Sequence, residues 1–203
     1  MLAGTNGAGK SSIGGEALRA AGVEFYNPDE AARRIGLRQP HLTQLELNSI
    51  AWHHGRRLLE RSIAEQLDYA FETTLGGETI TSLLERAAVA GAEVRIWYAG
   101  LASPEFHIER VRMRVAKGGH DIPEVDIRRR YDQSRLNLIR LLAKLVDLRV
   151  FDNSVEGDPD AGQEPTPRLL LHWRARRIVA PSTLERTPDW AKPIVVVAIK
   201  LAG

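Results

Sequence analysis

The 203-residue sequence contains no cysteine, only two methionines, and aromatic residues at 6% of the total. Without cysteine, neither a disulfide framework nor a thiolate metal site can form. No apolar run approaches membrane-spanning length, and no signal peptide is recognisable ahead of the first motif. These absences exclude a membrane as the expected partner and favour a cytoplasmic protein.

Neither sign of charge is in large excess, because the formal net charge is only +2. The basic residues are nevertheless clustered, and most are arginines. The clusters are Arg56-Arg57, Arg110-Arg112-Arg114, Arg128-Arg129-Arg130 and Arg174-Arg176-Arg177. A nucleic-acid surface would explain such clusters, but a site for several phosphates needs the same local charge. Hydrophobic residues make up 43%, which is enough for a core of one α/β domain.

Residues 4–11 match the pattern G-x-x-x-x-G-K-[ST], which is typical of a phosphate-binding loop. Glycines let the backbone turn so that successive N–H groups point at phosphate oxygens, and the following helix adds its positive dipole end. The predicted nucleotide-binding residues are Gly4, Thr5, Asn6, Gly7, Ala8, Gly9, Lys10, Ser11 and Ser12. Lys10 would reach the β- and γ-phosphates of ATP, and the Ser11 hydroxyl would bind Mg²⁺.

The rest of the chain alternates between strand-like and helix-like segments. Strands are predicted over residues 23–26, 67–71, 94–99, 148–151 and 194–199, with a hairpin over 169–179. Helices are predicted over residues 11–20, 30–35, 43–65, 78–90, 104–117 and 123–144, and a surface loop over 156–166. Only three residues precede Gly4, so the first strand is either a stub or begins upstream of this sequence.

This alternation predicts an α/β fold of the P-loop NTPase type. The sheet would be mostly parallel with helices on both faces, a helical lid and a C-terminal β extension. Residues 1–154 would form the P-loop core, with the lid around 104–135, and residues 155–203 would pack on the same domain. Ligands bind such sheets at the C-terminal ends of the strands.

Asp29 follows a predicted strand and is the first candidate for chemistry outside the loop. A kinase needs a carboxylate near the γ-phosphate to orient and deprotonate an acceptor hydroxyl. The alternative is that Asp29 caps the helix behind it. Glu72, Thr73 and Thr74 follow another strand and would suit a polyol or sugar. Their alternative is capping of the helix that begins at Glu78.

Arg110 and Arg114 lie one turn apart on a predicted helix, whereas Arg112 points elsewhere. They are either a solvated basic face or lid arginines that fold over the transferring phosphate. The segment Gly118-Gly119-His120-Asp121-Ile122-Pro123 joins two helices and is flexible enough for a closing lid. His120 has no neighbouring ligand in sequence that would indicate a metal site.

Several motifs follow the loop in a fixed order and together resemble the zeta-toxin family of P-loop kinases, in its compact branch. They are Asn27-Pro28-Asp29, Phe71-Glu72-Thr73-Thr74-Leu75, Ile108-Glu109-Arg110-Val111, Arg114-Val115, residues 118–123, Arg128-Arg129-Arg130-Tyr131 and Phe151-Asp152-Asn153-Ser154. The resemblance covers roughly residues 1–154.

The resemblance implies a kinase that phosphorylates a hydroxyl of UDP-N-acetylglucosamine and has an antitoxin protein as candidate partner. It implies Asp29 as the general base, Arg110 as a lid arginine and Glu72 as an acidic residue that meets the substrate. The second lid arginine of classical toxins has no clear match, and His120 and Arg128 are the nearest candidates. Thr73-Thr74-Leu75 replaces a glycine and an arginine of those toxins, so phosphoryl transfer carries over better than the acceptor's identity.

The sequence therefore predicts an ATP- and Mg²⁺-dependent kinase that phosphorylates a hydroxyl of a small polar metabolite, for which a UDP-N-acetylhexosamine is one candidate. A P-loop hydrolase or switch would use the same loop to position water. A non-catalytic nucleotide-binding or regulatory protein is the third alternative. Generic nucleic acid is not the expected partner.

Overall fold

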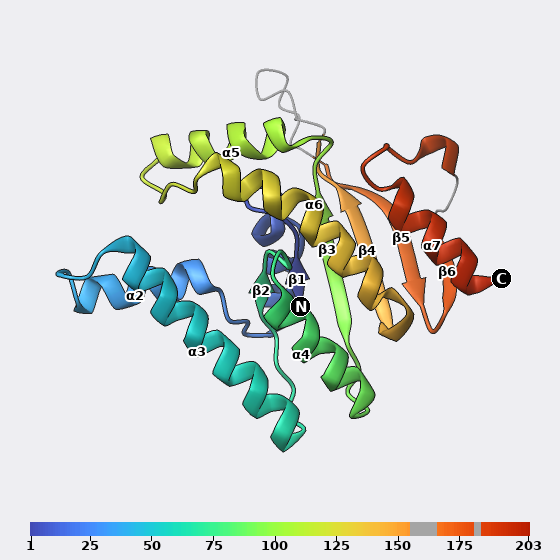
Figure 1. Cartoon of the computed structure of the whole chain (residues 1–203), viewed down its shortest axis with the longest axis horizontal. Coiled ribbons are helices and arrows are strands. Elements are labelled where there is room, and N and C mark those ends of the chain that lie inside the picture. Colours follow the sequence, from blue (N-terminus) through green and yellow to red (C-terminus); the bar gives the residue numbers. More distant parts are fainter. Residues whose placement is uncertain (155–165, 181–183) are drawn as a thin grey trace.

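A computed structural model of the chain describes residues 1–154, 166–180 and 184–203 (Figure 1). The surface loop predicted over 156–166 lies outside the described residues except for its last position. Across the described residues, the helices lack an apolar stretch of the length needed to cross a membrane.

A six-stranded sheet runs through the molecule in the order β2-β1-β3-β4-β5-β6. Its strands are β1 (Leu2–Ala3), β2 (Glu72–Thr73), β3 (Arg95–Gly100), β4 (Asp147–Asp152), β5 (Arg168–Arg174) and β6 (Arg177–Ala180). The first four strands in this order pair in parallel, and β5 and β6 add an antiparallel extension. The parallel part brings the ends of β1, β2 and β4 to one edge, where the predicted site residues lie.

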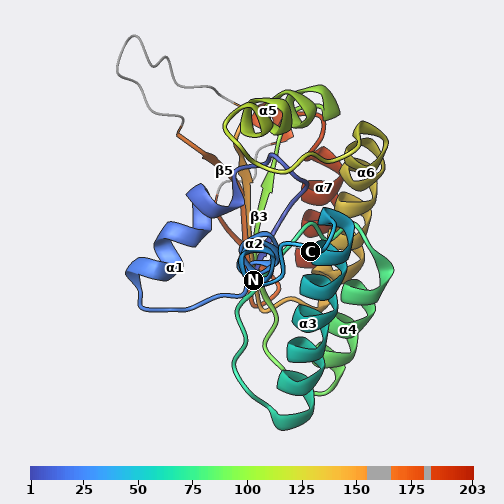
Figure 2. The same cartoon turned by 90° about the vertical axis from the view of Figure 1, so that its left-hand side faces the viewer.

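The two faces of the sheet are covered unequally (Figure 2). The helices α4 (Glu78–Val89), α6 (Glu124–Leu141) and α7 (Lys192–Ala202) pack on one face, where the main core contains Leu138, Trp173 and Ile194. The other face carries the short α1 (Glu16–Ala20). The helix α5 (Pro104–Ala116) crosses the end of the sheet at which β3 and β4 finish. Helices on both faces and a mostly parallel sheet confirm the predicted fold class.

A helical hairpin of α2 (Pro28–Arg38) and α3 (Gln44–Glu65) projects to one side of the sheet (Figure 1). Thr43 and Glu46 form a capping box at the start of α3, as their spacing favours. Ala31, Ala32, Leu47 and Ala51 form a small core within the hairpin, separate from the main one. The outer part of the hairpin therefore packs on itself, whereas Leu59 in the second half of α3 belongs to the main core.

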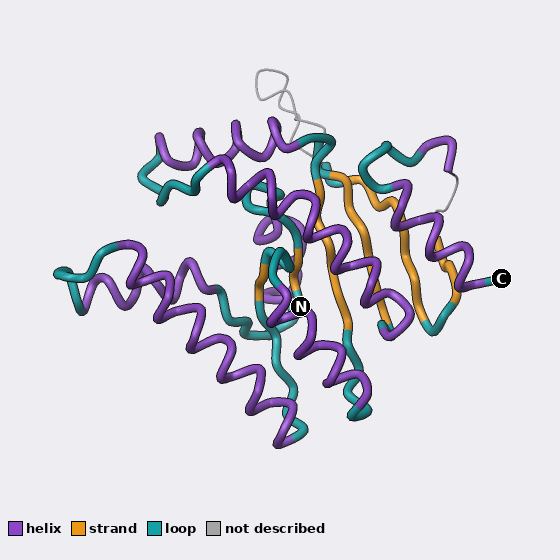
Figure 3. Tube along the Cα trace, viewed as in Figure 1, coloured by secondary structure: helices purple, strands orange, loops and turns teal. Residues whose placement is uncertain are grey.

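The prediction of a strand over 194–199 is wrong, because these residues belong to α7 (Figure 3). Ile194, Val195 and Ala198 are buried at helical spacing, and Pro193 lies in the first helical turn. A short apolar run has no periodicity that separates a buried helix from a buried strand. The α7 face instead fills the main core beside α6.

Three other boundaries differ from the prediction. Residues 23–26 and 67–71 contribute only a single bridge, between Tyr26 and Phe71, in place of the two predicted strands. The helix predicted over 30–35 extends further at both ends and runs as α2 from Pro28 to Arg38. The helix after the loop begins with a π-helical turn, Ser11–Gly15, before α1. Gly14 allows this turn to approach Leu2, since a Cβ there would lie 2.3 Å from the Leu2 side chain.

Candidate active site

The glycine-rich loop adopts a conformation that only glycine tolerates at its two central turns. Gly7 and Gly9 have φ values of 81° and 80°. A Cβ at Gly9 would lie 2.3 Å from Asn153 Nδ2, and one at Gly7 would lie 2.8 Å from the His107 carbonyl oxygen. Glycine at these two positions therefore allows a tight turn that a side chain would block.

Groups from three separate segments hold this loop in place. The Asn153 side chain, just after β4, donates to the Ala8 carbonyl oxygen over 3.0 Å. Arg110 of α5 donates to the Asn153 carbonyl oxygen over 2.7 Å, so its guanidinium lies beside the loop. Arg130 of α6 donates to Asn6 Oδ1 over 2.8 Å. Asn153 and Arg130 thus bond to the loop directly, and Arg110 and Arg130 bring positive charge to it.

His107 of α5 lies beneath the loop and is almost fully buried. Its Nδ1 lies 2.7 Å from the Asn6 carbonyl oxygen, so Nδ1 carries the hydrogen of this bond. Burial lowers the pKa of His107 to about 4, and nearby Lys10 and Arg110 act in the same direction. His107 is therefore a neutral structural support of the loop at neutral pH.

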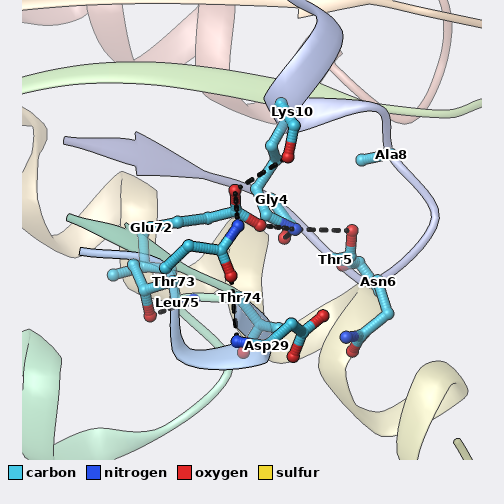
Figure 4. A network of polar contacts seen from close by, with 12 residues as sticks. Gly4, Thr5, Asn6, Ala8, Lys10, Asp29, Glu72, Thr73, Thr74 and Leu75 are labelled. Atoms are coloured by element: carbon cyan, nitrogen blue, oxygen red, sulfur yellow. Dashed lines mark hydrogen bonds and ion pairs between the residues drawn. The ribbon is translucent and has the colours of Figure 1, made fainter. Parts of the chain in front are cut away.

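Lys10, Ser11 and Glu72 converge at the mouth of the loop, and Figure 4 shows Lys10 beside Glu72. The Lys10 ammonium lies 3.4 Å from Glu72 Oε1 and donates to the Gly4 carbonyl oxygen over 2.9 Å. The Ser11 hydroxyl donates to Glu72 Oε2 over 3.1 Å. The Asn27 side chain donates to the same oxygen over 3.2 Å. A hydroxyl and a carboxylate side by side supply the oxygen ligands that Mg²⁺ prefers.

The structure excludes the capping alternative for Glu72. The helix α4 that begins at Glu78 has Gly77 as its N-cap, with no side-chain cap. Glu72 instead lies at the end of β2, next to β1, and uses both carboxylate oxygens on loop residues and Asn27.

The structure also excludes Asp29 as the cap of α2. The cap is Asn27, whose side-chain oxygen accepts from the backbone N–H groups of Asp29 and Glu30. The Asp29 carboxylate is half exposed and lies 3.5 Å from Arg114 Nη1 and 3.8 Å from His120 Nε2. Arg114 also donates to the His120 carbonyl oxygen over 3.2 Å. Asp29 therefore faces the joint between α5 and α6.

Thr73 and Thr74 follow Glu72, and the hydroxyl of each contacts the backbone two residues further along the chain. The Thr73 hydroxyl accepts from the Leu75 N–H over 3.0 Å and the Thr74 hydroxyl from the Gly76 N–H over 3.4 Å. Ser134 of α6 in turn donates to the Thr74 carbonyl oxygen. Each threonine hydroxyl keeps its own hydrogen for donation to a ligand.

A cavity of about 560 Å³ connects these groups. Lys10, Asp29, Glu72 and His120 line it together with residues of α3. It lies between the α2–α3 hairpin and the first turns of α6. A second cavity of about 1080 Å³ is lined by residues such as Met1, Leu67 and Val94 and contains none of the predicted site residues. The smaller cavity is therefore the candidate active site.

Seven of the predicted site residues line this cavity, whereas Arg110, Arg128 and most of the loop do not. The seven are Asn6, Lys10, Asp29, Glu72, Thr73, Thr74 and His120. Arg128 pairs with Glu105 over 2.6 Å on an exposed surface. Ser12 is also exposed, within the π-helical turn. Four residues with clear contacts at the site had no assigned role from sequence. They are Asn27, His107, Arg130 and Asn153. Three of them stand in quoted motifs, and His107 directly precedes another.

Comparisons with known proteins identify solved structures that share this fold. No family model matches the chain. A Haemophilus influenzae protein described as uncharacterized is 29% identical over 129 residues, which is 63% of this chain and 88% of the relative. Among solved structures, a chain of the AvrRxo1-ORF1:-ORF2 complex with ATP superposes with a TM-score of 0.63 at 15% identity. The match covers 100% of this chain and 75% of that one.

A second solved structure comes from the PezAT chromosomal toxin–antitoxin system of Streptococcus pneumoniae. Its TM-score is 0.51 at 16% identity, with 74% of this chain and 65% of that chain covered. At these identities the likeness shows a common fold. The chain thus shares the architecture of these two structures.

Proposed function

We propose that this protein is an ATP-dependent kinase that transfers the γ-phosphate to a hydroxyl of a small polar metabolite. The observation that supports this most is the meeting of Lys10, Glu72 and Asp29 around one cavity beside the loop. The resemblance to zeta toxins adds a UDP-N-acetylhexosamine as candidate acceptor. The solved AvrRxo1 complex contains ATP, which supports ATP as the donor.

The loop would bind the triphosphate through its backbone N–H groups, and Lys10 would move its charge from Glu72 and the loop carbonyls onto the β- and γ-phosphates. Ser11 would bind Mg²⁺ through its hydroxyl, and Glu72 would supply carboxylate oxygens beside it. When bound, Mg²⁺ would neutralise negative charge on the phosphates. Arg110, fixed beside the loop by Asn153, would stabilise the charge that develops during transfer.

Asp29 would accept the proton of the acceptor hydroxyl as that oxygen attacks the γ-phosphorus. The new O–P bond forms while the bond from the γ-phosphorus to the β,γ-bridging oxygen breaks, and ADP leaves with that electron pair. Arg114 at the end of α5 and His120 in the joint of residues 118–123 would orient the Asp29 carboxylate. Thr73, Thr74 and Glu72 would bind acceptor hydroxyls near the same point.

Arg130 fits the role of a second phosphate-facing arginine better than Arg128. Burial lowers the pKa of Arg130, and its guanidinium contacts the loop residue Asn6. Arg128 pairs with Glu105 at the surface instead. We therefore propose Arg110 and Arg130 as the pair that bears on the transferring phosphate, with α5 and the first half of α6 as a lid.

An antitoxin protein is the proposed macromolecular partner. The PezAT structure belongs to a toxin–antitoxin system, and AvrRxo1-ORF1 was solved together with AvrRxo1-ORF2. Coexpression of this chain with the product of an adjacent gene, followed by copurification, would test the partner. No stable complex with any adjacent product would argue against it.

The kinase proposal is tested with a metabolite panel, measuring ADP release and phosphorylated products by ³¹P NMR. Acceptor-dependent ADP with a new phosphomonoester signal is the expected result. Equal ADP release with and without every acceptor would identify a hydrolase. Saturable ATP binding without ADP would identify a nucleotide-binding protein.

A further inference from the structure

The turn between β5 and β6 carries a cluster of arginines that the candidate active site does not use. Arg174 ends β5, Arg176 lies in the turn and Arg177 begins β6, and all three are exposed. Their side chains make no hydrogen bond or ion pair to any residue that the structure describes. Asp147 stands opposite Arg174 in the pairing of β4 and β5, but its carboxylate already contacts His172 over 3.1 Å. Three positive charges are thus gathered without a counter-charge from the described part of the chain.

The turn that holds these arginines has a strained backbone. Ala175 and Arg176 have φ values of 49° and 62°, in the left-handed region. A two-residue hairpin turn of this kind is normally built from asparagine and glycine, because a Cβ raises the energy of the left-handed conformation. The chain therefore keeps an arginine where glycine would be more stable. Strain of this kind is concentrated at positions whose side chains have a function.

The strand that follows the turn, β6, lies at the edge of the sheet. It pairs with β5 on one side, and no strand of the described residues pairs with its other side. The edge strand of an antiparallel pair leaves alternate backbone N–H and C=O groups free for another extended chain. Val179 in this strand is 57% exposed. The arginine cluster thus stands at the start of an unpaired strand edge.

The two faces of β6 differ in chemistry. Ile178 pairs with Trp173, which is fully buried in the main core, so Ile178 lies on the face that α7 covers. Arg177 pairs with Arg174 and lies on the opposite face. A strand added beside β6 would therefore place alternate residues against the arginines and the others against Ile178. Acidic side chains suit the first set and apolar side chains the second.

A nucleic acid would be attracted by the same charge but fits this surface less well. Proteins bind single-stranded nucleic acids with aromatic rings on which the bases stack. Trp97 of β3 has the Arg149 guanidinium carbon 5.0 Å from its ring centre, and a Cβ at Gly14 would lie 3.0 Å from the ring. This ring is therefore already used for packing. An unpaired strand edge, in contrast, offers backbone hydrogen bonds in the pattern that a polypeptide matches.

We propose that β6 and the turn of residues 174–177 bind an acidic segment of another polypeptide, which adds to the sheet as a further strand beside β6. Acidic side chains of that segment meet the arginines, and its apolar side chains meet Ile178. The turn lies at the end of the sheet opposite the glycine-rich loop, because Arg174 pairs with Asp147 at the start of β4. This inference goes beyond the proposed kinase function and does not depend on it.

The test measures binding of fluorescein-labelled peptides to the whole chain by fluorescence anisotropy at physiological salt. The probe is the alternating peptide (Glu-Val)₄ with an amidated C-terminus. Three controls separate the contributions to binding: (Glu-Pro)₄ keeps the charge but loses the N–H of every second residue, (Lys-Val)₄ reverses the charge, and octauridylate is a nucleic acid polyanion. The probe should bind at least about tenfold more tightly than each control.

Substitutions then separate charge from turn stability. Arg176→Gly should weaken probe binding about two- to fivefold, as expected for one exposed ion pair, and should raise Tm because glycine tolerates the left-handed backbone. Ala175→Gly is the matched control, since it relieves the neighbouring strain and removes no charge. It should raise Tm and leave probe affinity unchanged. Arg38→Ala removes an exposed arginine of α2 and should leave probe affinity unchanged.

Four results would overturn this inference. Absence of probe binding removes the surface altogether. Equal binding of (Glu-Pro)₄ and the probe would show attraction by charge without strand addition. Binding of octauridylate as tight as that of the probe would identify a nucleic-acid surface. Equal loss of probe affinity in Arg176→Gly and Arg38→Ala would show that the turn has no special part in binding.

Discussion

The two walls of the cavity are built in different ways. On the nucleotide side, Lys10 is 8% exposed and the loop is bonded to α5, α6 and the end of β4. On the acceptor side, Asp29 is half exposed and its two partners come from the joint of residues 118–123 and the end of α5. The α2–α3 hairpin behind it has only a small core of its own.

This difference corresponds to the two kinds of ligand that the proposed reaction would use, a triphosphate and a variable acceptor. A triphosphate is the same in every reaction, so a rigid loop with prearranged donors binds it at low reorganisation cost. An acceptor varies in shape, and a helical hairpin packed on few residues can change its cavity side without disturbing the sheet. Specificity is therefore expected on α3, and reaction chemistry on the loop.

Removing the charge on the nucleotide side should have the largest effect. Lys10→Ala is expected to reduce phosphoryl transfer on the order of 10³- to 10⁵-fold, because no other loop side chain brings a full positive charge to the β- and γ-phosphates. Single-turnover transfer assays would measure this, with circular dichroism to check the fold. Near-normal transfer in folded Lys10→Ala protein would contradict the assignment of the loop.

The acceptor side should show a kinetic effect without a binding effect. Asp29→Asn is expected to lower transfer about 10²- to 10⁴-fold and to leave ATP affinity unchanged, because it would remove the proposed base, which does not touch the loop. Stability should also be unchanged, since Asn27 and not Asp29 caps α2.

Asn27→Ala is the matched stability control for that experiment. It should lower the free energy of unfolding by about 1 kcal/mol through loss of the cap. If Asp29→Asn destabilises the protein as much as Asn27→Ala and leaves transfer intact, Asp29 is structural and not the base.

A smaller effect is expected from the partner of Asp29. Arg114→Ala should lower transfer about three- to tenfold. The substitution breaks a half-exposed ion pair with Asp29 but leaves the Asp29 carboxylate in place. ATP affinity measured by calorimetry should not change. Arg112→Ala is the control on the same helix, since Arg112 pairs with Glu124 away from the cavity. Equal transfer rates in the two variants would show that Arg114 does not contribute to catalysis.

The smallest effect concerns His107, whose burial beside the loop can be tested by measuring the free energy of unfolding against pH. No effect on the transfer rate at neutral pH is expected. The pKa of His107 is about 4 in the folded protein and near 6.5 when unfolded, so the unfolded state binds the extra proton between these values. The contribution is complete above pH 6.5 and is lost as pH falls to about 4, by up to about 3 kcal/mol. His107→Asn should flatten this part of the curve of unfolding free energy against pH.

The sequence predicted the loop and the class of fold because both depend on local rules. The spacing of Gly4, Gly9 and Lys10 specifies the cradle, and helices with clear caps were placed nearly to the residue. Ser103 caps α5 and Thr43 caps α3, as their sequences indicate. Residues 194–199 were misassigned because a run of six apolar residues fits a strand and a buried helix equally well.

Part of the site was also visible in sequence, since strand ends in a parallel sheet meet at one edge. Lys10, Asp29 and Glu72 were predicted to lie together, and the fold brings them to one cavity. Sequence could not choose between capping and catalysis for Asp29 and Glu72. That choice depends on which backbone N–H groups lie nearby, and these were already satisfied by Asn27 for α2, whereas α4 takes no side-chain cap.

The amino-acid sequence by itself thus determined a P-loop, its lysine and an α/β chain, through conformational and periodic constraints that act over a few residues. Only the tertiary structure decided which arginines reach the loop. Arg128 and Arg130 stand two positions apart on α6, so they point to different sides of that helix. Packing of α6 beside the loop turns Arg130 toward Asn6 and leaves Arg128 with Glu105 at the surface.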